Sequence, residues 1–371
     1  MKKILSLMLA CVLLLCGAGL GPGAKAAASS ADDALGVCAA EEAPLAANAR
    51  SRSAAPAYCL YCSRVHTGFS GKLTGFFHGI AYIFCMLFHI EKTEGRMRFS
   101  TVTIHAGADA PFRFLHISDT HLTLCDARDD AKKQALAKSR SESFPFSLRM
   151  LDDAQVKANE LGCFIVHTGD IIDFISEKNL ERVKQFTEDN DVFATAGNHE
   201  FYRYIFGESD TPAQREANLA KVQSAFGNDI RFAARQVNGV NIVAIDNGFY
   251  HIDQWQLNRL KEEMAKGMPI LLCLHVPLYA PDIYDHTAEV FGRPLWMMSV
   301  PEALMGEFNE DEYRQQKEDA VTHEAYELIT NSDCIKAIFA GHMHYDYVSQ
   351  VTPTLKQYIV NVDAGNIVEV D

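Results

Sequence analysis

The sequence predicts an α/β protein in which short buried strands alternate with longer amphipathic helices. Three observations favour this class. From residue 99 onward, short apolar runs alternate with segments whose apolar residues recur at helical spacing. The runs are continuously apolar, which is typical of strands covered on both faces. Polar side chains that suit metal binding follow several of these runs directly, and sites in layered α/β proteins form at that edge of the sheet.

The expected strands are short, and most of them end at a polar motif. A β-hairpin is expected around Asn238-Gly239, which is a favourable two-residue turn. The last two strands are expected to form a closing pair. In chain order, the expected strands are 112–117, 163–167, 191–195, 231–237, 240–245, 270–274, 335–340, 357–362 and 367–370.

Helical periodicity predicts three long helices between these strands, and an acidic run predicts a fourth. Asp253 is the expected N-cap of the third helix. The expected helices are 146–161, 213–226, 253–266 and 307–318. The apolar residues that mark the first of them are Leu148, Leu151, Ala154 and Ala158.

Residues 278–332 interrupt the alternation of strands and helices. The segment is rich in proline and stands between two motifs that carry candidate metal ligands. An insertion of this size at such a place predicts a lid or a wall for the substrate. A packed structural excursion is an equal alternative.

Residues 1–72 do not follow the pattern of the core. Residues 1–26 are expected to be a signal peptide or a membrane segment, because Lys2-Lys3 precedes the apolar stretch 4–16 and a small-residue cleavage site follows. Residues 27–72 lack periodicity and are expected to be a disordered linker. This linker carries Cys59, Cys62 and His66, whose spacing suits either a zinc knuckle or loose thiols.

Residues 73–96 are expected to form an apolar or amphipathic helix and a short linker. The run 73–90 is at the lower limit for a membrane span and suits an interfacial helix equally. Membrane association is thus expected through 4–16 or 73–90. The protein is predicted to be exported or membrane-associated if residues 1–96 belong to it. A chain that started at Met97, where the domain 97–371 begins, would be cytoplasmic.

The composition limits the partners. The formal net charge is −14, which excludes a general nucleic-acid binder because such a protein needs a basic face. A small phosphorylated substrate is compatible with this charge, since bound metal ions supply positive charge locally. The four cysteines after residue 100 are scattered singly, which predicts free thiols rather than a disulfide framework.

Five polar motifs carry the candidate chemistry, and each follows an expected strand. They are Asp119-Thr120-His121, Gly169-Asp170-Ile171-Ile172-Asp173, Gly197-Asn198-His199-Glu200, His275 and Gly341-His342-Met343-His344. Carboxylate, imidazole and amide oxygen together suit first-row transition metals better than calcium or magnesium alone.

The spacing within the motifs predicts how their side chains point. Residues i and i+2 of an extended segment share a face, so Asp119 and His121 are expected to point together, and so are His342 and His344. Asp170 is the expected bridge between two metal ions. It is central in the order of motifs, and the glycine before it lets the backbone come close.

The ordered set D-x-H, G-D-x-x-D, G-N-H-E, H and G-H-x-H resembles the calcineurin-like metallophosphoesterase superfamily. Any single motif is weak, but all five are present, in order, over 112–344. The resemblance implies a four-layer αββα sandwich with a dinuclear metal site at its top edge.

The resemblance also implies a role for each motif residue. The first metal ion would be held by Asp119, His121, Asp170 and His344. The second would be held by Asp170, Asn198, His275 and His342. His199 would be the histidine near the leaving group that binds no metal, and Asp173 would support a ligand or His199.

The implied activity is hydrolysis of phosphate mono- or diesters by a hydroxide that two divalent metal ions activate. His199 would assist the departing alkoxide. Mn, Fe, Zn and Co all accept these ligands. Two alternatives remain open: a non-catalytic metal-binding scaffold, and a membrane-anchored surface protein whose N-terminal segment is the functional part.

Overall fold

The computed structural model describes residues 95–205 and 211–371, all of which belong to one compact unit, Ser63–Asp371. The predicted signal peptide, the linker 27–72 and the apolar run 73–90 lie outside the described residues. No helix in the described ranges is both long and apolar enough to span a bilayer.

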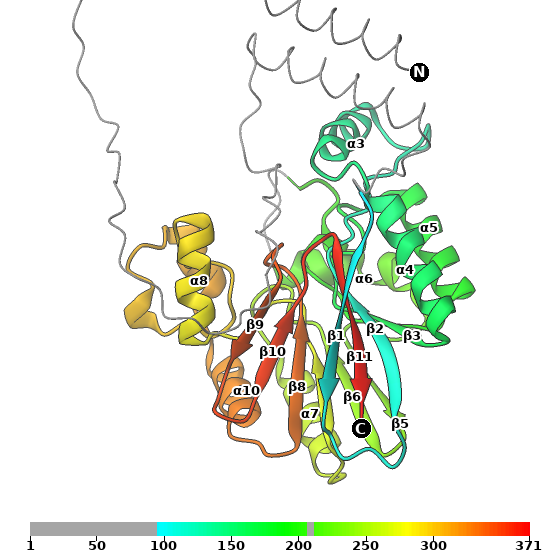
Figure 1. Ribbon diagram of the computed structural model, residues 1–371. Coiled ribbons are helices and arrows are strands. Elements are labelled where there is room, and N and C mark those ends of the chain that lie inside the picture. Colours follow the sequence, from blue (N-terminus) through cyan, green and yellow to red (C-terminus); the bar gives the residue numbers. More distant parts are fainter. Residues whose placement is uncertain (1–94, 206–210) are drawn as a thin grey trace, which may run out of the picture. The chain divides into compact units, whose positions relative to one another are not determined.

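Two mixed sheets form the centre of the molecule (Figure 1). The first has the order β1-β11-β2-β3-β4, and the second has the order β5-β6-β7-β8-β10-β9. The strands of the first sheet are β1 (Arg98–Ile104), β2 (Phe112–Ile117), β3 (Phe164–His167), β4 (Val192–Ala194) and β11 (Ala364–Val370). Those of the second are β5 (Phe232–Val237), β6 (Val240–Ile245), β7 (Ile270–Cys273), β8 (Ile335–Ala340), β9 (Tyr347–Gln350) and β10 (Lys356–Ile359).

Neighbouring strands that lead into the motifs run parallel. β2, β3 and β4 are parallel in the first sheet, and β6, β7 and β8 are parallel in the second. Parallel neighbours place their carboxyl ends at one edge of a sheet, so the loops that follow them meet there.

Five helices of the described ranges lie on the outer faces of the two sheets. Among those described, α4 (Ser147–Leu161), α5 (Glu177–Asp189) and α6 (Pro212–Gln223) pack on the first sheet, and α7 (Gln254–Met264) and α10 (Ala320–Thr330) pack on the second. The others are α3 (Ala131–Ser143), α8 (Pro281–Phe291), α9 (Glu310–Gln316) and the 3-10 turns η1 (His199–Phe201) and η2 (Glu302–Leu304).

Alternate residues of an inner strand pack against different layers: one set faces the other sheet, and the other set faces the outer helices. Phe114 of β2 faces the second sheet and meets the ring of Phe339 edge-on, with centroids 5.3 Å apart. Its neighbour Leu115 belongs to the cluster that includes Leu151 of α4. Both faces of the strand are therefore buried, which explains its continuously apolar sequence. The expected four-layer αββα sandwich is confirmed.

Two expectations about the elements are wrong. The last two strands do not pair with each other, because β10 lies between β8 and β9 while β11 lies between β1 and β2. The chain crosses from one sheet to the other between them. Leu148 does not lie on the buried face of α4: its exposed fraction is 40%, whereas Leu151 is fully buried.

The segment 278–332 contains more regular structure than expected. Its last helix, α10, belongs to the outer layer of the sandwich, where Ala325 and Ile329 join the cluster that includes Leu257 of α7. Only the part before Ala320 therefore lies outside the basic alternation. The lid or substrate wall stays a prediction for that part.

The four cysteines within the described ranges are free thiols, as expected.

Candidate metal centre

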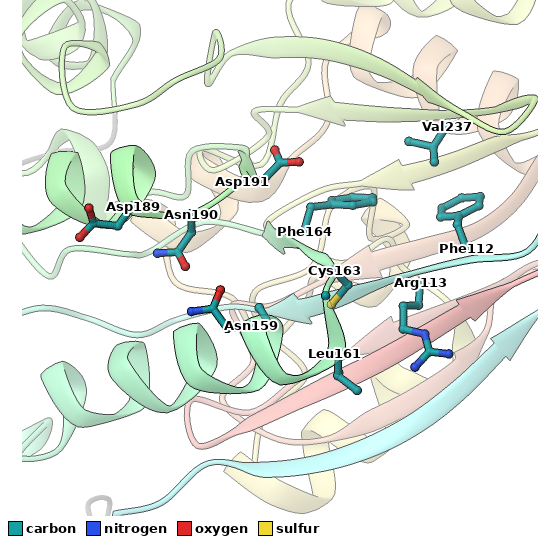
Figure 2. A pocket seen from close by; sticks show the side chains of 12 residues that line it. Phe112, Arg113, Asn159, Leu161, Cys163, Phe164, Asp189, Asn190, Asp191 and Val237 are labelled. Carbon is teal, nitrogen blue, oxygen red and sulfur yellow. The ribbon is translucent and has the colours of Figure 1, made fainter.

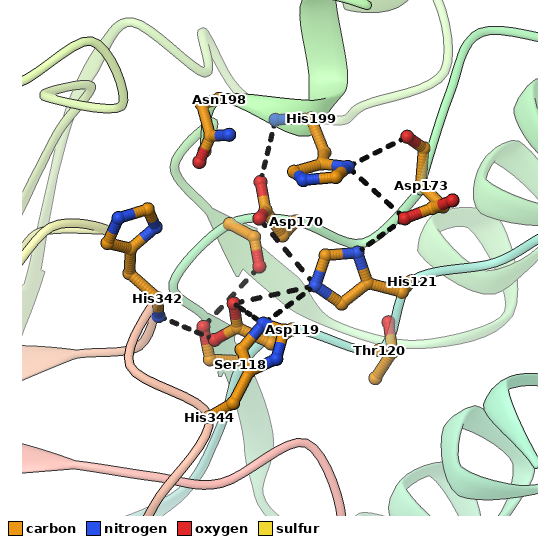
Figure 3. Close-up of polar contacts among 12 residues, drawn as sticks. Ser118, Asp119, Thr120, His121, Asp170, Asp173, Asn198, His199, His342 and His344 are labelled. Carbon is orange, nitrogen blue, oxygen red and sulfur yellow. Dashed lines mark hydrogen bonds and ion pairs between the residues drawn. The ribbon is translucent and has the colours of Figure 1, made fainter. Parts of the chain in front are cut away.

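The predicted ligands lie in loops that directly follow strands. Those loops come from both sheets and are joined by backbone hydrogen bonds. The N–H of Asp119 donates to the carbonyl of Gly169 over 3.0 Å in the first sheet, and the N–H of Gly341 donates to the carbonyl of His275 over 3.0 Å in the second. Figure 3 shows the resulting group of carboxylates and imidazoles.

One side of this group is formed by Asp119, His121 and His344. The Nε2 atom of His344 lies 3.4 Å from Oδ1 of Asp119, and Nε2 of His121 lies 3.7 Å from the same oxygen. The two Nε2 atoms are 3.1 Å apart. Three ligand atoms of metal-binding type therefore converge.

The other side is formed by Asp170, His275, His342 and Asn198. The Nε2 atom of His275 lies 3.3 Å from Oδ2 of Asp170 and 3.2 Å from Oδ1 of Asn198. Nδ1 of His342 lies 3.1 Å from the same Nε2. This is a second set of converging ligand atoms.

Asp170 stands between the two sets. Its Oδ2 atom, 3.3 Å from His275, also lies 3.7 Å from Nε2 of His121. Both distances leave room for a cation between oxygen and nitrogen. Asp170 therefore lies between the two groups of ligand atoms, and its role as a bridge stays a prediction.

The expected pointing of the side chains is right for one pair and wrong for the other. Asp119 and His121 do converge, but His342 and His344 diverge into the two different sets (Figure 3). The reason is the backbone, because all four residues have φ between 45° and 68° and are not extended. The rule for residues i and i+2 of a strand does not apply to such a loop.

Asp173 fixes the orientation of two histidines. Its Oδ1 atom lies 3.0 Å from Nδ1 of His121 and 3.2 Å from Nδ1 of His199. The backbone carbonyl of Asp173 also accepts from Nδ1 of His199 over 2.8 Å. Because both acceptors are oxygens, Nδ1 of each ring carries the proton and Nε2 faces the site.

The charged groups of the cluster shift one another's pKa strongly. Burial lowers the pKa of His121, but Asp119, Asp173 and Asp170 together outweigh it and raise that pKa to about 10. Burial also lowers the pKa of His275, but Asp170 and Asp119 with the Thr168 carbonyl outweigh it and raise that pKa to about 9. Burial, and then the charge on His275, lower the pKa of His342 to about 3. Positive charge is thus strongly favoured next to the two carboxylates.

Cations fit this arrangement of ligand atoms. Oδ1 of Asp119 is buried and has no hydrogen-bond partner, a costly situation that a bound cation would remove. The Nε2 atoms of His121 and His344 lie 3.7 and 3.4 Å from that oxygen and are the other ligand atoms that such a cation would meet. The residues present therefore suit divalent metal ions.

Small residues let the loops approach closely. A Cβ atom at Gly341 would collide with Ser118 and Asp119, and one at Gly197 would collide with Asp170. These two glycines of the motifs are therefore needed for space.

Glu200 has a structural role that the sequence did not reveal. Its buried carboxylate accepts hydrogen bonds from the N–H groups of Gly197, Asp170, Ile171 and Ile172, over 2.6–3.3 Å. Burial, and then the charge of Asp170, raise its pKa to about 7. Its signal in the sequence is its place as the last residue of the Gly197-Asn198-His199-Glu200 motif, which does not reveal what the carboxylate binds.

Three further residues that touch the site were not predicted. Arg140 donates two hydrogen bonds to Asp173. Phe144 stacks on the ring of His121, with centroids 4.2 Å apart. The hydroxyl of Tyr250 lies 2.9 Å from Nε2 of His342. None of these belongs to a motif, so spacing could not find them.

The site opens to solvent at three partly exposed histidines, His199, His342 and His344. The side chain of His344 is 32% exposed and that of His199 is 15% exposed. Asp119, His121, Asp170 and His275 are buried. A substrate can therefore reach the cluster from the side of these partly exposed rings.

A separate cavity lies elsewhere on the sandwich (Figure 2). Its volume is about 760 Å³, and its walls come from the start of β2 and β3 and the ends of α4 and α5. Asn159, Cys163 and Asp191 are among its lining residues, and the predicted metal ligands are not. The cavity and the candidate site thus lie at different ends of the strands.

The fold and the site together define a class: a four-layer αββα sandwich with a buried cluster of carboxylates and imidazoles, suited to metal ions, at the carboxyl edge of its strands. The calcineurin-like phosphoesterase family matches residues 112–346. This is more than half of the chain and includes every predicted ligand. The chain belongs to the calcineurin-like phosphoesterase family, and its coarse class is that of hydrolases acting on phosphate esters.

Similar solved structures share little sequence with this chain. A dimetal phosphatase from Danio rerio is 15% identical, with a TM-score of 0.39, over 68% of this chain and 88% of that one. A putative 5′-nucleotidase from Staphylococcus aureus is 14% identical, with a TM-score of 0.36, over 68% and 48%. The phosphopantetheinyl hydrolase from Mycobacterium tuberculosis is 12% identical, with a TM-score of 0.35, over 67% and 89%. No curated protein matches the chain.

Proposed function

We propose that this protein hydrolyses small phosphate mono- or diesters with the help of two divalent metal ions. The observation that carries the proposal is the place of Asp170, whose Oδ2 atom lies within 3.7 Å of imidazole nitrogens from both ligand sets. A single carboxylate oxygen between two groups of ligands is the arrangement that a two-metal site needs.

The ligands divide into two sets that share Asp170. One ion would be held by Asp119, His121, Asp170 and His344. The other would be held by Asp170, Asn198, His275 and His342. When bound, the two ions supply the positive charge that activates water and neutralises the phosphoryl oxygens, and Mn, Fe, Zn and Co all suit these ligands.

His199 is placed to act on the leaving group. Its Nδ1 donates to Asp173, so its Nε2 is directed to the site, and when both ring nitrogens carry protons Nε2 can give one to the departing oxygen. Its partial exposure, 15% of the side chain, puts it at the opening rather than among the buried ligands. Asp173 holds the ring in the orientation that this proton transfer requires, and the negative charges of Asp170 and Asp173 favour the protonated ring.

The first test combines metal content and hydrolysis. The full chain is purified and assayed with p-nitrophenyl phosphate and bis-p-nitrophenyl phosphate, together with Asp170→Asn and the control Asp191→Asn. The control makes the same change at an exposed carboxylate that pairs with Arg235. We expect about two metal ions per chain in the wild type and the control, with hydrolysis of at least one ester.

Asp170→Asn should lose metal and activity together, because the amide keeps the size of the carboxylate but not its charge. Two bound ions without turnover of either ester would favour the non-catalytic scaffold. An Asp170→Asn protein that keeps its full metal content would contradict the bridging role.

A further inference from the structure

We propose that Arg140 is a positioning residue for proton transfer, because it holds Asp173 in the place from which Asp173 orients His199. The inference rests on the proposed function, since it concerns how that reaction is supported. It adds to the site a residue from helix α3, which lies outside the five motifs.

The contact between Arg140 and Asp173 is bidentate. Nε of Arg140 donates to Oδ2 of Asp173 over 2.7 Å, and a terminal nitrogen donates to Oδ1 over 2.9 Å. The Asp173 side chain is completely buried, and that of Arg140 is 18% exposed. A buried carboxylate requires such donors, and two parallel bonds fix its plane as well as its position.

The same carboxylate atom serves the histidines. Oδ1 of Asp173 accepts from Arg140 and lies 3.0 Å from Nδ1 of His121 and 3.2 Å from Nδ1 of His199. Without Arg140, Asp173 keeps its histidine neighbours but loses the two bonds that fix its plane. The ring of His199 then loses a fixed partner, and its Nε2 is no longer held in line with the leaving oxygen.

Helix α3 is attached to the site mainly by this end. Ala137 is the only buried residue of the helix, so apolar packing holds it weakly. Arg140 lies over the ring of Phe144, 5.0 Å from its centroid, and Phe144 stacks on His121. The guanidinium of Arg140 is therefore held by two contacts: its face lies over the ring of Phe144, and its nitrogens donate to the carboxylate of Asp173.

A direct contact between Arg140 and the substrate is the competing interpretation. It would make Arg140 a binding residue, whose loss raises KM. The geometry favours positioning, because two of its nitrogens are already directed to Asp173 and most of the side chain is buried. Positioning predicts a loss in kcat, and a larger loss for substrates that depend more on the acid.

The test uses Arg140→Ala in the full chain, with Arg182→Ala as the matched control. Arg182 also pairs with an aspartate, Asp152, at 2.6 Å, also lies over a phenylalanine ring, and is 14% exposed. Its helix, α5, supplies none of the proposed ligands. The substrates are the phenyl and p-nitrophenyl esters of the class, mono- or diester, that the wild type hydrolyses.

We expect Arg140→Ala to lower kcat roughly 10- to 100-fold on the phenyl ester and less than about 3-fold on the p-nitrophenyl ester, because phenol leaves poorly without a proton. KM should change little, guanidinium ions should restore part of the rate, and the control should match the wild type. In the His199→Asn background, Arg140→Ala should add no further dependence on the leaving group.

Two readouts do not depend on turnover. The metal content of Arg140→Ala should equal that of the wild type. The Nδ1 proton of His199, assigned in the NMR spectrum by its loss in His199→Asn, should exchange faster with water in Arg140→Ala because its acceptor is less fixed.

The outcomes separate the two proposals. A wild type that binds no metal and hydrolyses neither ester overturns the proposed function. If the wild type is active, three results would overturn the inference about Arg140 and leave the proposed function intact. Arg140→Ala could slow hydrolysis of both esters equally, or it could raise KM without lowering kcat. The third result is that the effects of His199→Asn and Arg140→Ala on the dependence on the leaving group add independently.

Discussion

Glu200 shows how one residue can build a site without touching the substrate. Its two carboxylate oxygens accept N–H groups from the loop after β3 and from the loop after β4. These loops carry Asp170 and Asn198, which belong to the same proposed ligand set. The distance between the two ligands is therefore set by a side chain between their backbones.

Replacing Glu200 by glutamine should destabilise the protein. The amide has one acceptor oxygen, so its NH2 group would face two of the four N–H donors. At pH 8, where the carboxylate is ionised, we expect Glu200→Gln to lower the free energy of unfolding by about 3 kcal/mol. Urea unfolding of the metal-free protein measures this change.

The control for this variant is Glu160→Gln, since the Glu160 side chain is 56% exposed and pairs only with Lys157. Its effect should stay within about 0.5 kcal/mol. Equal unfolding midpoints for the two variants would show that the four N–H groups do not need a carboxylate.

The residues of the site differ in how well the sequence reveals them. Asp119 and His275 were predictable because each follows an apolar strand within an ordered set of motifs. Arg140 was not, because it lies on a polar helix outside the motifs. The divergence of His342 and His344 was also hidden, since spacing does not reveal a backbone that leaves the extended region.

At the scale of one element, α4 shows what helical spacing predicts and what it does not. The helix was expected and is present, but its buried residues are Ser147, Leu151, Ala154 and Ala158. At 100° per residue, Leu148 lies roughly 90° from the centre of that face. It was counted as apolar and periodic, although it lies at the margin, where the sheet does not cover it.

The same substitution at two positions of α4 should have different effects. Leu151→Ala removes a fully buried side chain and should lower the free energy of unfolding by about 3 kcal/mol. Leu148→Ala changes a side chain that is 40% exposed and should stay within about 0.5 kcal/mol. Thermal or urea unfolding compares them. Similar losses would mean that Leu148 is packed as tightly as Leu151.

Helix α4 was predicted from its apolar periodicity, whereas helix α3 was not predicted because it has none. Its sequence has no apolar face, and only Ala137 is buried, so periodicity offers no signal. Its N-cap is Asp130, whose side chain accepts from the N–H of Lys133 over 2.8 Å. A helix that is held to a site by polar contacts cannot be predicted from apolar periodicity, and it is recognised only in the structure.

At the scale of the whole molecule, the interior contains histidines that are kept neutral. Burial lowers the pKa of His116 to about 3 and that of His167 to about 3. Both values lie below the ordinary histidine pKa of 6.5, so below pH 6.5 the unfolded chain binds protons that the folded protein does not. The stability that these two neutral histidines contribute is therefore complete above pH 6.5, and it is lost progressively as the pH falls towards 3.

The slope of this loss can be measured. Between about pH 4 and pH 6, each such histidine should add about 1.4 kcal/mol per pH unit to the fall in the free energy of unfolding. His116→Gln should reduce the slope by that amount. His105→Gln is the control, because its side chain is 81% exposed. An unchanged slope in His116→Gln would mean that His116 is already protonated in the folded state.

The features of the architecture that depend on local sequence pattern were predictable. Continuous apolar runs identified the inner strands, and the resemblance supplied the four layers. The order of the strands was beyond reach, because β11 inserts between β1 and β2 although it is the last element of the chain. Adjacency in sequence favoured a pair with β10, and only the packing of the two sheets decides otherwise.

Five candidate ligands have positive φ angles, so the residues proposed to bind metal also lower the stability of the fold. Asp119, His121, Asp170, His342 and His344 all adopt the left-handed region, which costs a residue with a side chain about 1–2 kcal/mol. The loops that collect the ligands are thus strained by several kcal/mol in total. Glycine at any of these places would relieve strain and remove a ligand. A descendant of this protein that no longer needed the reaction would gain stability by losing its site first.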